Sequence, residues 1–267
     1  MKKVVRKWFV VPLIVVTVLV LVGCNGTPPA PPEPAATNTE APTAEPTAMP
    51  TPIPPTATFT ATPDLAATEA VLATQEAEEL LKGITPVLNE VGVSPDRGSL
   101  GVVDDGPYFL VTRDYNGQAQ KILADGQVFT NFVIHVDIKW KSTMGFAGCD
   151  VGFRGEEDLV RGAIYRMRAM RLSGLPAWDI EYWRYNSFQS NPLGEVKFSN
   201  AIDLKDGAVN TFIIVMDGKT ATIYANGSRI GAATISQRES GVIGFYAWQD
   251  SGETSCEFSN IWVWELD

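Results

Sequence analysis

The stretch from Thr211 to Ile230, TFIIVMDGKTATIYANGSRI, gives the clearest indication of fold class. Two short runs rich in apolar and β-branched residues flank Asp217-Gly218, and a third run follows Asn226-Gly227. Asp-Gly and Asn-Gly between such runs are strong hairpin signals, because these residues tolerate the positive φ angles of a two-residue turn. The cross-strand pairs expected from these turns are Phe212 with Ile223, Ile214 with Ala221, and Ile223 with Ile230.

The residues in these pairs all lie on one face of the predicted sheet, so the two turns agree about which side is buried. The same alternation, with a period of two, recurs elsewhere in the chain. It covers Phe132–Trp140, Ala163–Arg171, Trp178–Tyr185, Gly241–Trp248 and Ser255–Leu266. Repeated short strands with turn signals, and no convincing helix after Ile84, predict an all-β, antiparallel sandwich of two sheets.

One of these hairpins is expected to have chemically different faces. It joins Ala163–Arg171 to Trp178–Tyr185 through a loose turn at Ser173-Gly174-Leu175-Pro176. Alternation along both strands separates an apolar face from a polar face. The apolar face would carry Tyr165, Met167, Ala169, Trp178, Ile180 and Tyr182. The polar face would carry Arg166, Arg168, Asp179, Glu181, Trp183 and Tyr185.

The first 23 residues are typical of an export signal. Four basic residues between Lys2 and Lys7 precede an apolar run from Trp8 to Val22, which is shorter than the about 20 residues of a bilayer span. Leu21-Val22-Gly23-Cys24 follows and resembles a bacterial lipobox, in which the bond before the cysteine is cut and its thiol carries diacylglycerol. We therefore expect a signal peptide at 1–23 and a lipid bilayer as partner through Cys24. The alternative is an uncleaved N-terminal anchor.

Residues 24–63 have the composition of a stalk. Between Thr27 and Pro63 lie 12 of the chain's 18 prolines and ten threonines, with no Gly, Lys or Arg. Such a segment cannot bury enough apolar surface to offset the entropy lost on ordering, so we expect a disordered, extended spacer. The mixture of Thr and Pro also suits O-glycosylation.

Residues 64–83 are predicted to form a helix before the β domain at 84–267. Thr62 can cap this helix, Pro63 suits its first position, and Gly83 can end it. Its apolar stripe is narrow and mostly alanine, and consists of Ala66, Ala70, Ala73, Ala77, Leu80 and Ile84. This stripe can pack on the domain, lengthen the stalk or pair with a second copy, so the oligomeric state is left open.

Charge and cysteine content indicate an exported acidic protein. The net charge of −10 becomes −14 once the four positive charges of residues 1–23 are removed. An acidic surface is poorly suited to nucleic acid or to anionic membrane, so no nucleic-acid partner is expected. Besides Cys24, the chain contains Cys149 and Cys256. Outside the cell we expect a disulfide between them, with two buried free thiols as the alternative.

Several segments resemble the concanavalin A-like superfamily, most closely its laminin-G-like and 3-keto-disaccharide-hydrolase-type domains in bacterial surface lipoproteins. They are Gly148–Arg154 (GCDVGFR) with Tyr165, Asn210, the two turn dipeptides, Gly241–Phe245 (GVIGF) and Cys256–Val263 (CEFSNIWV). The resemblance covers roughly residues 100–267 and implies a jelly-roll sandwich of two curved sheets. Many members of the superfamily bind or process glycans, although a fold does not by itself define a function.

The polar face of the central hairpin raises the possibility of a glycoside hydrolase. Asp179 and Glu181 are two residues apart, about 6.6–6.8 Å along a strand, a spacing that allows paired carboxylates to do acid/base or nucleophilic work. The pattern is similar to the Glu-x-Asp-x-x-Glu run of concanavalin A-like glucanases, but it lacks both outer carboxylates, and Ala177 stands at the first of these positions. Cross-strand salt bridges to Arg166 and Arg168 are the structural alternative.

Glycan binding is the function that we favour from the sequence. Aliphatic hydrogens of sugars pack well on aromatic rings, which makes Trp183, Tyr185 and Trp248 the candidate ligand-binding residues. A structural or adhesive surface protein with a protein partner is a further alternative. The sequence therefore predicts a lipid-anchored carbohydrate-binding protein on the extracellular face of the cell membrane.

Metal and nucleophile sites are not indicated by the sequence. It contains no Cys/His zinc spacing, no phosphate-binding glycine loop and no Ser-His-Asp set. The single histidine, His135, is expected to be a solvated surface residue. We expect no cofactor apart from a possible calcium ion, for which Asp104-Asp105 and Asp250 are the candidate ligands.

Overall fold

The described chain forms one α-helix followed by a series of β-strands, as its alternation of apolar and polar residues predicts. The computed structural model describes residues 65–104, 106–142 and 145–267, so the predicted signal peptide, Cys24, the stalk and Asp105 lie outside the described residues. The helix α1 is Leu65–Glu90. The other elements are β1 (Gly98–Asp104), β2 (Tyr108–Thr112), β3 (Gln118–Ile122), the short 3-10 helix η1 (Ala124–Gly126), β4 (Phe132–Ser142), β5 (Ala147–Gly155), β6 (Ile164–Leu172), β7 (Leu175–Arg184), β8 (Ser187–Ser190), β9 (Lys197–Phe198), β10 (Val209–Asp217), β11 (Thr220–Ala225), β12 (Ser228–Thr234), β13 (Val242–Gln249) and β14 (Thr254–Leu266).

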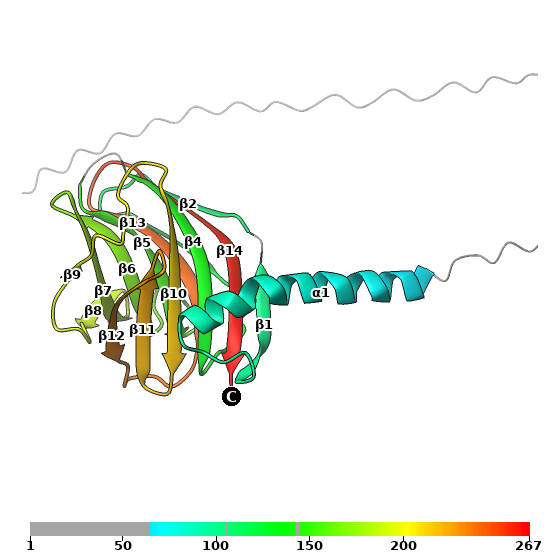
Figure 1. Cartoon of the computed structure of the whole chain (residues 1–267). Coiled ribbons are helices and arrows are strands. Elements are labelled where there is room, and N and C mark those ends of the chain that lie inside the picture. The colour runs from blue at the N-terminus through cyan, green and yellow to red at the C-terminus, as the bar shows by residue number, and fades with distance from the viewer. Residues whose placement is uncertain (1–64, 105, 143–144) are drawn as a thin grey trace, which may run out of the picture. The chain divides into compact units, whose positions relative to one another are not determined.

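The strands form two antiparallel sheets that pack face to face (Figure 1). Sheet A has the order β1-β14-β4-β10-β11-β12, and β2 also pairs with β14. Sheet B has the order β3-β13-β5-β6-β7-β8, and β9 also pairs with β7. Buried side chains of both sheets meet in one interior, where Phe212 and Ile223 of sheet A belong to the same cluster as Tyr165 and Trp178 of sheet B. The predicted all-β, antiparallel sandwich of two sheets is confirmed.

The first predicted hairpin turn is displaced by one residue. The two-residue loop is Gly218-Lys219, not Asp217-Gly218, and Gly218 has a φ of +58°, as a turn with glycine at its first central position requires. The observed pairs are Phe212 with Ala225, Ile214 with Ile223, and Met216 with Ala221. The predicted pairs are therefore wrong by two residues. Because side chains alternate with a period of two, a shift of two leaves the same residues on the buried face.

The second and third hairpins each have a tight two-residue turn. Asn226-Gly227 forms the predicted turn, but a bulge after Ile223 places that residue opposite Gly231, so the predicted pair with Ile230 is wrong. In the β6–β7 hairpin the loop is only Ser173-Gly174, shorter than predicted. Both hairpins still bury the predicted faces, since Ile223 is in the interior and Ile230 packs against it.

The predicted disulfide between Cys149 and Cys256 is confirmed and joins the two sheets. Cys149 lies on β5 of sheet B and Cys256 on β14 of sheet A, with Cα atoms 5.9 Å apart and a sequence separation of 107. Closing a loop of that length stabilises the fold by about 4–5 kcal/mol, chiefly by restricting the unfolded chain. Disulfides persist in oxidising compartments, so this bond indicates an extracytoplasmic location for the domain.

Helix α1 ends at Glu90, so the predicted end at Gly83 is wrong. Gly83 and Pro86 both lie inside the helix. The end is made at Gly92, whose φ is +76°, where the N–H groups of Gly92 and Val93 donate to the carbonyls of Asn89 (3.1 Å) and Leu88 (2.9 Å). These two bonds satisfy carbonyls that a helix C-terminus leaves free. Within the described residues, no helix is both long enough and apolar enough to cross a membrane.

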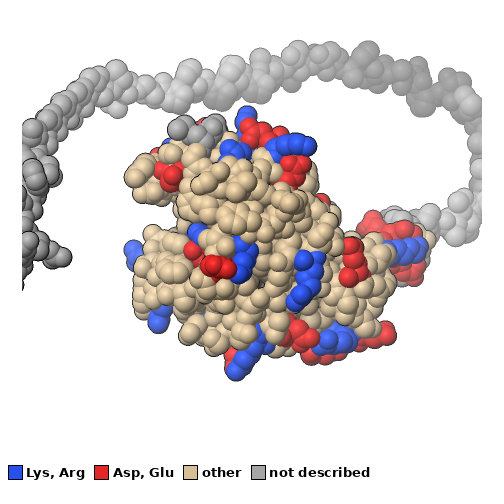
Figure 2. All heavy atoms as spheres, turned by 60° about the vertical axis from the view of Figure 1, so that its left-hand side comes forward, with Lys and Arg blue, Asp and Glu red and all other residues tan. Residues whose placement is uncertain are grey.

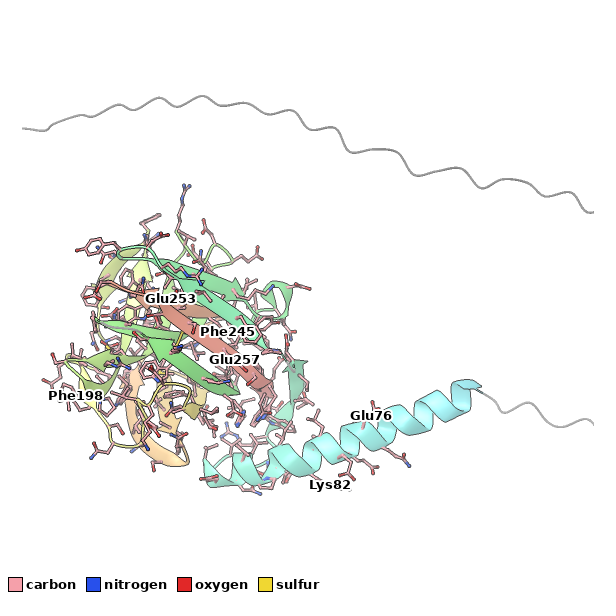
Figure 3. The ribbon with its side chains drawn as sticks, turned by 90° about the horizontal axis from the view of Figure 1, so that it is seen from above. Glu76, Lys82, Phe198, Phe245, Glu253 and Glu257 are labelled. Carbon is pink, nitrogen blue, oxygen red and sulfur yellow. A yellow bond between two sulfur atoms is a disulfide. The ribbon has the colours of Figure 1, made fainter. Side chains whose placement is uncertain are left out.

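The C-terminal half of α1 packs on the outer face of sheet A, which explains why the helix continues past Gly83. Ile84 and Leu88 are buried in one cluster with residues of β4, β10 and β14, among them Val133, Ile213, Trp262 and Trp264. Of the roles predicted for the helix, packing on the domain is confirmed for this half. The other half extends past the sheets, and Glu76 lies on that exposed part (Figure 3).

The prediction that His135 is solvated is wrong. Its relative exposure is 6%, because it lies beneath α1. Its ring stacks on the indole of Trp262 at 5.0 Å, and its Nδ1 lies 2.9 Å from the carbonyl oxygen of Asn260. The helix covers a sheet face that the sequence pattern alone would leave open to solvent.

Replacing Leu88 by alanine tests the docking of α1. Leu88 is completely buried between the helix and sheet A. We expect Leu88→Ala to lower the free energy of unfolding by about 2–5 kcal/mol, since it removes buried methyl groups and leaves a cavity. Chemical denaturation measures the change. Leu81→Ala on the same helix, where the side chain is 38% exposed, is the control and should change stability by less than about 0.5 kcal/mol. Equal effects would contradict the docked arrangement.

Candidate functional site

The candidate site is built on the outer face of sheet B by residues that alternate with core residues. On β5 the disulfide draws Cys149 inward, so Asp150 faces outward. On β6, Met167 lies in the core and leaves Arg166 and Arg168 outside. We call the resulting group the charged cluster, and it consists of Asp150, Arg166, Arg168, Asp179 and Glu181. All of these charged side chains are buried, which is unusual on an outer sheet face.

Arg168 binds two carboxylates of the neighbouring strand. Its Nε and Nη2 donate to the two oxygens of Asp179, both at 2.8 Å, in a bidentate pair. The same Nη2 lies 2.7 Å from Oε1 of Glu181. Asn191 also donates to Asp179, at 3.3 Å. The cross-strand salt bridges considered as the structural alternative are thus present for Arg168.

Arg166 has different partners from those expected. Its Nε donates to Oδ2 of Asp150 at 2.8 Å, its Nη2 contacts the same oxygen, and its Nη1 donates to Gln118 at 2.9 Å. The other oxygen of Asp150 accepts the indole N–H of Trp248 at 2.5 Å. The charged cluster therefore consists of two bonded groups, one around Arg166 that reaches Gln118 on β3 and Trp248 on β13, and one around Arg168 on β6 and β7.

Aromatic rings lie over both guanidinium groups. The guanidinium carbon of Arg166 is 4.1 Å from the ring centre of Tyr246 and 5.2 Å from that of Trp183, and that of Arg168 is 5.2 Å from Trp248. Cations over aromatic faces in this range attract the ring electrons. A Cβ on Gly148 would lie 3.0 Å from the Trp248 ring, so glycine at this position allows the indole to lie close over β5.

A cavity of about 360 Å³ opens above this face. Its lining residues are Asn116, Gly117, Gln118, Phe146, Arg166, Arg168, Trp183, Asn186, Trp248, Gln249 and Asp250. Phe146 contacts Trp248 edge to face at 4.7 Å and extends the aromatic wall. The cavity therefore combines aromatic rings with amide and guanidinium groups, a composition typical of ligand sites that need both shape and hydrogen bonds.

Burial changes the acidity of one carboxylate in the cluster. It raises the pKa of Glu181 to about 7, with the nearby Asp179 acting in the same direction and Arg168 opposing it. On the face shown in Figure 2, acidic and basic side chains lie in small groups separated by uncharged surface.

The candidate residues named from the sequence do not all line the cavity. Trp183 and Trp248 line the same cavity, from strands β7 and β13. Tyr185 lies in the loop after β7 with a φ of +54° and 70% exposure, outside the cavity lining. Asp179 is completely buried. Glu181 accepts a hydrogen bond from the indole N–H of Trp183 at 2.7 Å.

Some site residues were not identified from the sequence. Asp150 could have been found, because an inward Cys149 on a strand requires an outward neighbour. Phe146, Asn116 and Asn186 come from connections between strands, where no periodic pattern assigns a direction to the side chain. Gln118 belongs to a short edge strand that the alternation did not reveal.

The suggested calcium ligands do not form a metal site within the described residues. Among these residues no group of three or more His, Cys, Asp or Glu side chains is placed to hold an ion. Asp104 accepts the hydroxyl of Tyr108 and the N–H of Gly106, and Asp250 accepts the N–H of Phe146. These carboxylates are used in local hydrogen bonds on different sheets, so the calcium hypothesis gains no support.

Comparison with known proteins found similar solved structures but no matching family. No protein-family model and no curated protein matches the sequence. Among solved structures, the carbohydrate-binding module CBM66 from Bacillus subtilis is similar, with 14% identity, a TM-score of 0.47 and coverage of 64% of this chain and 98% of that chain. Sheep galectin-11 in complex with glycerol has 11% identity, a TM-score of 0.34 and coverage of 55% and 99%. A beta-glucanase of Bacillus licheniformis has 12% identity, a TM-score of 0.41 and coverage of 65% and 84%. At these identities and TM-scores the function of this chain has to be argued from its own site.

Removing Arg168 tests the charged cluster. In Arg168→Met both Asp179 and Glu181 lose their buried partner, so we expect the free energy of unfolding to fall by about 3–5 kcal/mol at neutral pH. Denaturant titration measures it. The double variant Arg168→Met/Asp179→Asn should recover part of the loss, because it removes one of the two unpaired charges. The control is Lys139→Met, whose pair with Glu257 is partly exposed and is worth about 0–1 kcal/mol. An equally small effect of Arg168→Met would contradict the buried ion pairs.

Proposed function

We propose that this domain binds a glycan in the cavity on the outer face of sheet B. The observation that supports this most directly is that Trp183 and Trp248 line one cavity above the fixed guanidinium groups of Arg166 and Arg168. Sugars present C–H faces that pack on aromatic rings and hydroxyl groups that need hydrogen-bond partners. The cavity supplies both kinds of contact from side chains whose positions are fixed by their neighbours.

The charge of the cavity floor favours a neutral glycan. Arg166 and Arg168 supply two positive charges, and the three carboxylates behind them balance or exceed these charges. An anionic ligand would therefore find little net attraction at this site. Partly free N–H and amide groups can still bind hydroxyl oxygens, which is the chemistry of neutral sugar recognition.

Binding is better supported than glycoside hydrolysis. Asp179 is completely buried and both of its oxygens accept hydrogen bonds from Arg168, so it is poorly placed to reach a substrate. Glu181 is held by Arg168 and Trp183. A hydrolase would need two carboxylates on either side of the scissile bond, and this pair is instead used in ion pairs.

We also propose that the domain is displayed outside the cell on the predicted stalk, with the acylated Cys24 in the membrane. The disulfide between Cys149 and Cys256 supports an oxidising location. The apolar run and lipobox-like residues before Cys24 supply the export and acylation signals. Acyl chains anchor a protein lastingly when two or more are present.

A glycan array with purified protein tests the binding proposal. We expect retention of at least one neutral oligosaccharide or polysaccharide and no release of reducing ends. For that ligand, Trp183→Ala and Trp248→Ala should each weaken binding at least about tenfold, or 1.4 kcal/mol, because a stacking surface is lost. Isothermal titration calorimetry measures the change.

The matched control for these variants is Phe109→Ala. Phe109 is an exposed aromatic residue on sheet A, away from the cavity, so its loss should leave affinity unchanged. Equal weakening by all three variants, or no glycan retained by the intact protein, would contradict the proposal. Hydrolysis that disappears in Glu181→Gln would instead establish the enzyme alternative, and retention of a protein ligand alone would favour the adhesive one.

Replacing Cys24 tests the anchor. We expect Cys24→Ala to remove acylation and move the protein from the detergent phase to the aqueous phase in detergent partitioning, because no thiol is left to carry the lipid. Mass spectrometry of the N-terminal peptide should show the matching loss of the acyl groups. Asn25→Ala is the control and should remain in the detergent phase. Continued membrane association of Cys24→Ala would support an uncleaved N-terminal anchor.

A further inference from the structure

Glu181 occupies the point where the charged cluster meets the aromatic wall of the cavity. Its Oε1 lies 2.7 Å from Nη2 of Arg168, and its Oε2 accepts the indole N–H of Trp183 at 2.7 Å. One carboxylate thus connects a fixed cation on β6 with an aromatic ring that lines the cavity. The carboxylate itself is buried and is not among the lining residues.

The hydrogen bond to Glu181 is the only side-chain hydrogen bond described for Trp183. Trp183 is only partly buried and lies near the end of β7, where its ring meets Phe188 edge to face at 6.5 Å. Trp248, by contrast, packs over Gly148, bonds to the completely buried Asp150 and contacts Phe146. The orientation of Trp183 is therefore set by its hydrogen bond to Glu181 and the guanidinium of Arg166, together with apolar packing against a buried cluster that includes Tyr246.

Charged groups from several strands face Glu181. They are Arg166 and Arg168 on β6, Asp179 on the same strand as Glu181, and Asp150 on β5. The carboxylates outnumber the guanidinium groups, so one uncompensated negative charge is confined in a buried place. Burial and this surplus together raise the pKa of Glu181 to about 7. Burial also raises the pKa of Asp150, which bonds to Trp248, whereas Glu181 is the carboxylate of the cluster that bonds to Trp183.

We propose that Glu181 is a positioning residue that holds the indole of Trp183 in the binding cavity, and that uptake of one proton by this carboxylate weakens the hold. The ionised carboxylate accepts from Arg168 and Trp183 at once, and both hydrogen bonds are strengthened by its charge. The protonated group keeps its shape but loses the ion pair with Arg168. The importance of this for ligand affinity rests on the proposed glycan-binding function.

Two measurable properties then change in opposite directions with pH. The pKa of Glu181 is higher in the folded protein than the ordinary 4.5, so the folded state binds the proton more tightly than the unfolded state. Its contribution to stability is therefore complete below about pH 4.5 and is lost as the pH rises through 7. Ionisation of Glu181 strengthens its hydrogen bond to Trp183, so the affinity for glycan increases over the upper part of the same pH range. A purely structural role for Glu181 does not predict this opposition.

The test follows the indole N–H resonance of Trp183 by ¹⁵N nuclear magnetic resonance between pH 5 and 9. The resonance is assigned by its absence in Trp183→Phe. We expect a single titration with a midpoint near pH 7 in the intact protein and no titration in Glu181→Gln. Glu257→Gln, which removes an acid on the outer face of sheet A, is the matched control and should keep the titration. A resonance that does not move, or that moves equally in Glu181→Gln, would overturn the proposal.

A second measurement connects the proton to the ligand. With a neutral glycan retained on the array, we expect affinity at pH 5.5 to be about fivefold lower than at pH 8, and independent of pH in Glu181→Gln. Affinity that is equal at both pH values would overturn the link to binding. The resonance experiment needs no ligand, so a titrating indole in a protein that binds no glycan would refute the proposed function while leaving the role of Glu181 established.

Discussion

Each side chain that points into the interior between the sheets forces its neighbours along the strand to point outward, and this constraint determines the site. On β5, the bond from Cys149 to β14 leaves Asp150 facing out beneath Trp248. On β6 and β7, antiparallel register then sets Arg168 directly opposite Asp179. The ion pairs follow from this geometry, since facing positions on adjacent strands bring opposite charges within bonding distance.

Burying so many charges costs free energy, and the partners within the cluster must offset it. Replacement of a buried ion pair by apolar residues is often neutral or stabilising, so stability alone gives little reason for such a cluster. What the charges supply is rigidity, because each guanidinium has a fixed carboxylate behind it and an aromatic ring over it. A prearranged surface loses less entropy when a ligand binds than a flexible one does.

The sequence predicted which side of each strand is buried better than it predicted turn positions and contacts between distant segments. Alternation assigned Tyr165, Arg168 and Glu181 to the correct sides, because a period of two survives small errors of register. It placed the first hairpin turn one residue too early, since Gly218 can occupy either central position. It also missed what depends on contacts distant in sequence: the burial of His135 under α1, and the part that Phe146 has in the cavity wall.

The disulfide has a mechanical consequence. Helix α1 docks on sheet A, whereas the cavity opens on sheet B, so tension between the N-terminal chain and a captured polymer would act across the interior. The two sheets are held together there by apolar contacts, which separate easily when pulled apart. Cys149 adjoins Asp150 of the cavity floor, and its sulfur is bonded to the strand that packs against the helix. If the domain is tethered and binds a glycan as proposed, this bond would give the load a covalent connection between the two sheets.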